Sequence, residues 1–182
     1  MIVILGASGS GKTTLVNSLI EKDNKYHRIV TYTTRPIRYG EENGIDYHFL
    51  GEGEFDRRIN DGFFAETDEY RGYFYGTAKE DCNSKNAIAI LTPAGLRSLK
   101  KQGIDIFSVY LDVDRRSRLI SLLNRGDDVD IAYRTTLIDT GEYKGVEHDV
   151  DAVLNNYSYH ISKEELPYIF LNYLRLWENG IS

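Results

Sequence analysis

The stretch that decides the fold is residues 1–22, MIVILGASGSGKTTLVNSLIEK. Its first part, Ile2–Leu5, is short, continuously apolar and β-branched, as expected for a parallel strand that is buried on both faces. Its last part places apolar residues at helical spacing, with Leu15, Val16 and Leu19 on one face. Between them, residues 6–13 read GASGSGKT and fit the phosphate-binding pattern G-x-x-x-x-G-K-[ST] at every specified position. The segment therefore predicts a strand, a phosphate-binding loop and a helix.

Each residue type in this loop has a physical role. Glycines let successive backbone N–H groups point at phosphate oxygens, and the N-terminus of the following helix adds about half a positive charge. Lys12 would reach the β- and γ-phosphates, and the Thr13 hydroxyl would bind Mg²⁺. We therefore expect ATP or GTP to bind here. The expected cofactor-binding residues are Gly6, Ala7, Ser8, Gly9, Ser10, Gly11, Lys12, Thr13 and Thr14.

The rest of the chain alternates apolar runs of strand length with segments of helical period, which favours an α/β fold. Further strands are expected at Ala87–Leu91, Asp105–Leu111 and Asp151–Leu154. Three helices have recognisable N-terminal signals. These are Thr92-Pro93 for the first, Asp112 or Asp114 for the second, and the capping-box pair Ser162 and Glu165 for the last. Trp177 in the last helix is interpreted as a packing residue.

Two segments differ from this alternation. Residues 31–86 are rich in Gly and Tyr, with short alternating runs that predict a small β-rich lobe inserted into the core. Residues 124–146 are polar and charged, contain Arg125 and Arg134, and predict a mobile segment. We expect one domain over residues 1–182, with its core in residues 1–30, 87–123 and 147–182.

Composition excludes several classes of protein. The chain has 182 residues, enough for about one domain. Cys82 has no partner cysteine, and it and His48 are interpreted as structural. No apolar run approaches the ~20 residues of a membrane span, and no secretory leader pattern is present. The formal charge of −6 argues against a broad nucleic-acid surface. We expect a cytoplasmic monomer or homodimer without nucleic-acid or membrane partners.

A second positively charged segment lies at residues 33–49, TTRPIRYGEENGIDYHF. Arg35 and Arg38, on a chain stiffened by Pro36, form a forked array of donors that suits a second phosphate. The alternative is that both are ordinary solvated surface arginines. Tyr47 and Tyr75 are equally compatible with simple packing.

Taken together, these segments closely resemble the guanylate kinase family. The resemblance covers the phosphate-binding loop, residues 33–49, Phe64-Ala65-Glu66, residues 73–77 (YFYGT), Arg125-Gly126 and Arg134, and thus spans most of the chain. It implies a P-loop kinase fold with a three-layer α/β core and a parallel sheet. In that fold, residues 31–86 would form an NMP-binding lobe and residues 124–146 a short lid.

The resemblance also implies roles for individual residues. Lys12, Arg35, Arg125 and Arg134 would be catalytic, with Asn156 on the ATP side. The GMP site would consist of Thr31, Arg35, Arg38, Glu41, Tyr47, Glu66, Tyr75 and Thr77, with Glu66 facing the guanine. One carboxylate accepts both the N1–H and the 2-amino group of guanine, whereas adenine lacks this donor pair. The alternative for Glu66 is an exposed strand residue.

The chain departs from the family at the strand that ends near residue 91. The family has acidic residues where this chain has Ile90 and Thr92, and we therefore consider Asp112 as a carboxylate near the metal. We expect ATP-dependent phosphoryl transfer to GMP or dGMP. The alternatives are a P-loop kinase for another phosphorylated small molecule and a binding module without catalysis. The intact Lys12 and Thr13 favour an enzyme.

Overall fold

Five parallel strands form the main sheet of the structure, a computed structural model that describes residues 1–180. The strand order is β2-β7-β1-β8-β9, with β1 at the centre. The bounds are β1 Ile2–Leu5, β2 His27–Arg28, β7 Ala87–Ile90, β8 Phe107–Asp112 and β9 Ala152–Asn155. Every pair in this sheet is parallel. The expected parallel α/β core is thereby confirmed, although β8 begins two residues later than its pattern suggested.

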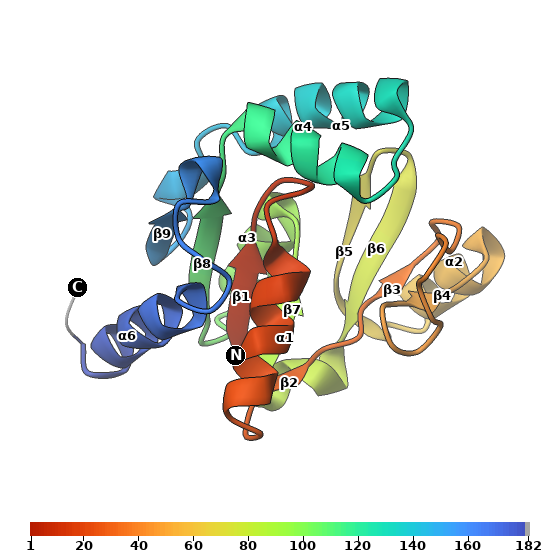
Figure 1. Ribbon diagram of the computed structural model, residues 1–182. Coiled ribbons are helices and arrows are strands. Elements are labelled where there is room, and N and C mark those ends of the chain that lie inside the picture. The colour runs from red at the N-terminus through yellow and green to blue at the C-terminus, as the bar shows by residue number, and fades with distance from the viewer. Residues whose placement is uncertain (181–182) are drawn as a thin grey trace.

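Helices cover both faces of the main sheet and make a three-layer core (Figure 1). Leu15, Val16 and Leu19 of α1 (Lys12–Lys22) pack on one face together with Phe170 and Leu174 of α6 (Leu166–Glu178). The helix α3 (Pro93–Lys101) packs on the other face through its buried leucines. Because both faces are covered, the central strand consists entirely of buried apolar residues.

The expected helix caps are present. The Thr92 side chain accepts a hydrogen bond from Gly95 N at 3.0 Å, and Asp114 caps α4 (Arg115–Asn124) by accepting from Ser117 N at 2.9 Å. Ser162 and Glu165 exchange the two hydrogen bonds of a capping box, at 3.1 and 3.2 Å, just before α6. Residues 1–180 also contain three short 3₁₀ turns: η1 Lys79–Asn83, η2 Val146–His148 and η3 Tyr157–Tyr159.

A second, mostly antiparallel sheet lies within residues 31–86, in the order β4-β3-β6-β5. Its strands are β3 Tyr32–Thr33, β4 His48–Phe49, β5 Phe64–Tyr70 and β6 Tyr73–Ala78, with α2 at Glu52–Asn60. His48 stacks on Tyr32 with ring centroids 4.5 Å apart, which agrees with its interpretation as structural. That this sheet acts as an NMP-binding lobe stays a prediction at this point.

Residues 124–146 are more ordered in secondary structure than the polar sequence suggested. They contain α5 (Val129–Glu142), which Asp128 caps by accepting from Asp130 N and Ile131 N. The sequence did not predict this helix, because its burial is the opposite of that of an ordinary amphipathic helix. Thr136 and Asp139 are fully buried, while its isoleucines and Leu137 are exposed. Figure 1 shows α4 and α5 side by side above the carboxyl ends of the main strands. No helix in residues 1–180 has the length and apolar character of a membrane span.

Candidate active site

A cavity of about 850 Å³ opens where the phosphate-binding loop, the second sheet and the α4–α5 pair meet. It brings together most of the residues that the sequence singled out. These are Gly6, Ser8, Gly9, Gly11, Lys12, Thr13, Thr14, Thr31, Arg35, Arg38, Glu41, Tyr47, Glu66, Tyr75 and Arg125. The stretches that supply them are far apart in the chain, so the two expected anion sites share one space.

The phosphate-binding loop has the geometry of an anion cradle. Gly9 and Gly11 have φ angles of 81° and 91°, in the left-handed region where side chains are disfavoured. No side chain caps the N-terminus of α1, so its first N–H groups face the cavity without a protein partner among the described residues. The Ser10 hydroxyl is buried and likewise lacks a described partner. Ala7 and Ser10 complete the loop without lining the cavity.

Lys12 lies folded back on this loop. Its Nζ donates to the carbonyl oxygens of Gly6 at 2.6 Å and Ala7 at 3.1 Å. Burial lowers the pKa of Lys12 to about 8, and the nearby Asp139 carboxylate partly offsets that effect. An ammonium group that has lost much of its hydration interacts strongly with any phosphate that replaces water around it.

The arginine pair forms the expected forked array. Arg35 is only 7% exposed, so the surface alternative is wrong for it, whereas Arg38 stays exposed at the cavity wall. Glu41 orients both residues, since one carboxylate oxygen accepts from Arg35 Nη2 at 2.7 Å and the other from Arg38 N at 2.8 Å. Partial desolvation of its guanidinium against the cavity wall, together with the charges of Arg35 and Arg125, lowers the pKa of Arg38. Positive charge therefore converges on this wall.

Two tyrosines and a buried carboxylate complete the second-sheet side. Tyr47 and Tyr75 line the cavity with their ring centroids 6.1 Å apart. Glu66 is only 5% exposed and accepts a hydrogen bond from Thr77 Oγ1 at 2.6 Å, so the exposed-strand alternative is wrong. Burial raises the pKa of Glu66 to about 7, and the charge of Asp68 contributes.

Asp68 is a cavity residue that sequence reasoning missed. Its Oδ2 accepts from Thr92 Oγ1 at 2.5 Å, which places a carboxylate beside the strand end that lacks the family acids. Glu66, Asp68 and Tyr70 occupy alternate positions of β5 and all line the cavity. Once Glu66 is assigned to the cavity, this period of two is the signal that identifies Asp68.

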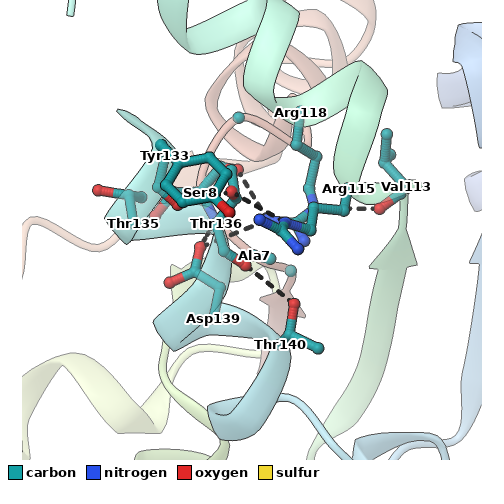
Figure 2. Close-up of polar contacts among 12 residues, drawn as sticks. Ala7, Ser8, Val113, Arg115, Arg118, Tyr133, Thr135, Thr136, Asp139 and Thr140 are labelled. Carbon is teal, nitrogen blue, oxygen red and sulfur yellow. Dashed lines mark hydrogen bonds and ion pairs between the residues drawn. The ribbon is translucent and has the colours of Figure 1, made fainter. Parts of the chain in front are cut away.

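A second missed cluster surrounds Asp139 of α5, which is fully buried (Figure 2). Its carboxylate accepts from Ser8 N at 2.6 Å, from Arg71 Nη2 at 3.1 Å and from the Tyr70 hydroxyl. Arg118 Nη1 of α4 lies 3.5 Å from the same carboxylate and 3.4 Å from Ser8 O. One acidic side chain thus connects the phosphate-binding loop, the β5–β6 hairpin and the α4–α5 pair.

Besides Ala7 and Ser10, four residues expected at the site do not line the cavity: Thr77, which reaches it only through Glu66, and Asp112, Arg134 and Asn156. Arg134 is exposed on α5 outside the cavity lining. The Asn156 side chain is engaged with Ile161, donating to its oxygen at 3.2 Å and accepting from its N–H at 2.8 Å. Asp112 accepts from two tyrosine hydroxyls, one of them that of Tyr157 at 2.6 Å. The placement of Asp112, Arg134 and Asn156 gives no support to a role in nucleotide or metal binding.

Few side chains that line the cavity are placed to ligate a metal ion. Within residues 1–180, no group of three or more His, Cys, Asp or Glu side chains is arranged to hold a metal ion. The Thr13 hydroxyl at the cavity wall is compatible with Mg²⁺, which binds nucleotide phosphates through one or two protein groups and keeps several waters.

Comparison with known proteins gives a consistent result. A family model described as "Guanylate kinase" matches residues 1–166. A guanylate kinase of Oleidesulfovibrio alaskensis is 34% identical, covering 94% of this chain and 86% of that protein. One from Agrobacterium fabrum is 32% identical, covering 86% of this chain and 74% of its own length. The crystal structure of guanylate kinase from Anaplasma phagocytophilum aligns with a TM-score of 0.72 and 22% identity, over 97% of this chain and 85% of that one, which supports the fold.

Proposed function

This chain belongs to the guanylate kinase family, and from that premise we propose that it transfers a phosphoryl group from ATP to GMP or dGMP. The observation that carries the proposal is the buried carboxylate of Glu66 in the same cavity as the glycine-rich loop. A carboxylate at this depth is costly unless a ligand supplies donors for it. The N1–H and 2-amino groups of guanine are such donors.

The donor side fits a nucleoside triphosphate. The uncapped N-terminus of α1 offers backbone N–H donors to phosphate oxygens. Thr13 is the residue that would hold Mg²⁺, which would neutralise part of the charge of the phosphates when bound. Lys12 would leave the loop carbonyls and pair with the terminal phosphates.

The acceptor side fits a nucleoside monophosphate. Arg35 and Arg38 would bind its phosphate with the hydroxyls of Tyr47 and Tyr75, while Glu41 keeps Arg35 in place. Thr77 leaves one carboxylate oxygen of Glu66 free to face the base, and Thr31 lies buried in the same wall.

The reaction needs positioning rather than a general base. The phosphate of GMP is already anionic at neutral pH, because its second pKa is about 6. One of its oxygens forms a bond to the γ-phosphorus of ATP while the bond from that phosphorus to the β–γ bridging oxygen breaks, leaving ADP. Lys12, Arg35, Arg38 and Arg125 hold the two anions together and stabilise charge on the transferring group.

We further propose that Asp68 supplies the acidic group that Ile90 and Thr92 do not. The carboxylate comes from β5 instead of β7, and Thr92 Oγ1 donates to it at 2.5 Å. This placement favours GMP over a different phosphorylated acceptor. A cytoplasmic location, a monomeric or homodimeric state and the absence of nucleic-acid and membrane partners remain predictions.

A coupled assay of ADP release tests the proposal. Purified protein with ATP and Mg²⁺ is offered GMP, dGMP, AMP, UMP or CMP at equal concentration. We expect turnover with GMP and dGMP at least 100-fold above that with AMP, because adenine would leave Glu66 without its donor pair. Turnover with another acceptor alone would overturn the assignment of GMP. Binding of GMP without turnover in the presence of ATP would indicate the non-catalytic alternative.

A further inference from the structure

The tip of the β5–β6 hairpin carries an arginine in a backbone conformation that side chains disfavour. Arg71 has a φ of 58° and Gly72 a φ of 74°, and these two residues alone join Tyr70 to its partner Tyr73. A two-residue turn with both φ angles positive favours Asn-Gly. A residue with a Cβ costs about 1 kcal/mol or more in this region, and such strain concentrates at functional positions.

The side chain of Arg71 contacts α5 at the wall of the cavity. Its Nη1 donates to Thr135 Oγ1 at 2.9 Å and its Nη2 to Asp139 Oδ1 at 3.1 Å. The side chain is 19% exposed and lines the cavity. Its Nε is buried and has no partner among the described residues. The guanidinium is therefore fixed at two points, while its buried Nε–H remains unused.

Asp139 brings this guanidinium to the phosphate-binding loop. One oxygen of its carboxylate accepts from Arg71 and the other from Ser8 N at 2.6 Å, so a single carboxylate separates the arginine from the loop. Arg118 approaches the same carboxylate from α4 at 3.5 Å (Figure 2). Carboxylate and phosphate oxygens accept from the same N–H donors. The position is thus suited to an anionic group that lies against the loop.

We propose that Arg71 is a catalytic residue that binds the transferring phosphate of the donor nucleotide, and that Asp139 is the positioning residue that aims its guanidinium at the loop. The proposal rests on the proposed phosphoryl transfer. Arg71 and Asp139 are 68 residues apart in sequence. The charge is therefore in place only when the hairpin tip and α5 both lie over the loop, which couples closure of the site to stabilisation of the transition state.

Arg71→Asn is the decisive variant, because asparagine suits the left-handed backbone but lacks the guanidinium. We expect kcat to fall about 100-fold, with KM for GMP changed less than threefold. Arg71→Lys retains the positive charge but lacks the forked donors of arginine. Its kcat should therefore lie between those of Arg71→Asn and the wild type. Arg116→Ala removes an exposed arginine of α4 and should leave kcat unchanged.

Isothermal titration calorimetry provides a readout that does not depend on turnover. The affinity ratio of ATP to ADP isolates the terminal phosphate, and we expect Arg71→Asn and Asp139→Asn to lower that ratio about tenfold. If the wild type transfers nothing to GMP, the proposed function fails while this ratio still tests Arg71. A wild-type ratio together with wild-type kcat in Arg71→Asn would overturn the proposal. Should Arg71→Asn fail to fold, the same two measurements on Arg71→Lys decide.

Discussion

Replacing Glu66 with glutamine should stabilise the protein at pH 8 and at the same time abolish its preference for GMP. The side chain is 5% exposed, and its Oε1 accepts from Thr77 Oγ1 at 2.6 Å. Glutamine has nearly the same shape, and its amide oxygen can accept the same hydrogen bond. The substitution therefore removes a buried negative charge with little change in packing.

The stability change follows from the raised pKa. Burial moves the pKa of Glu66 from 4.5 to about 7, and each unit corresponds to about 1.4 kcal/mol. Between pH 4.5 and pH 7 the folded state keeps a proton that the unfolded chain releases, so wild-type stability falls as the pH rises through this window. The full cost, about 3 kcal/mol, is present above pH 7. Glu66→Gln should recover about 2–3 kcal/mol at pH 8 and almost nothing at pH 4.

Denaturant titrations at pH 4 and pH 8, followed by the fluorescence of the lone Trp177, measure this difference. Glu69→Gln is the matched control, because Glu69 is an exposed carboxylate on the same strand and outside the cavity lining. Its stability should stay within about 0.5 kcal/mol of the wild type at both pH values. If Glu66→Gln raised the free energy of unfolding equally at both pH values, the buried charge of Glu66 would not be the cause of the wild-type instability at pH 8.

The activity change tests recognition of the base. Glutamine turns an N–H donor toward one of the two guanine donors, so two hydrogen bonds to a charged acceptor are lost or reversed. This corresponds to about 4 kcal/mol, or about a thousandfold in kcat/KM for GMP. The low activity with AMP should change little. Equal losses for GMP and AMP, or no loss for GMP, would refute the assignment of Glu66 to guanine.

Further substitutions and pH test other parts of the site. In the wild type, kcat/KM for GMP should fall about tenfold per pH unit below pH 7, since protonated Glu66 cannot accept both guanine donors; a profile flat to pH 5.5 would contradict this. Lys12→Ala should lower kcat by about 10³-fold without loss of melting temperature, measured by the coupled assay and calorimetry. Arg35→Lys should raise KM for GMP about tenfold and leave KM for ATP unchanged, because lysine lacks the fork that Glu41 holds. Asp114→Ala should cost about 1–2 kcal/mol at pH 7 through loss of the α4 cap. Backbone N–H groups lower the pKa of Asp114 to about 2, so this stabilisation should disappear as the pH falls from 4 toward 2, while kcat at neutral pH is unaffected.

Much of the fold was predictable because its signals are local. The strand, loop and helix of residues 1–22 follow one another in the chain, and the caps at Thr92 and Asp114 act within a few residues. The second sheet was predictable as a β-rich insertion, since its strands alternate along their own length. The helix α5 was not predictable from the sequence, because its buried face contacts a polar site rather than an apolar core. Asp139 occupies a buried position at which an amphipathic helix normally has an apolar residue.

The sequence by itself predicted two anion sites, because the glycine-rich loop of residues 6–13 and the arginine pair Arg35 and Arg38 each lie within one continuous stretch. Tertiary structure alone decided which charges share the space between those sites. It placed Arg118 rather than Arg134 beside the loop, and brought Asp68 to Thr92 and Arg71 to Asp139. These pairs are 24 and 68 residues apart. Contacts at such separations depend on how the hairpin and α5 pack against the core, and no local pattern encodes that packing.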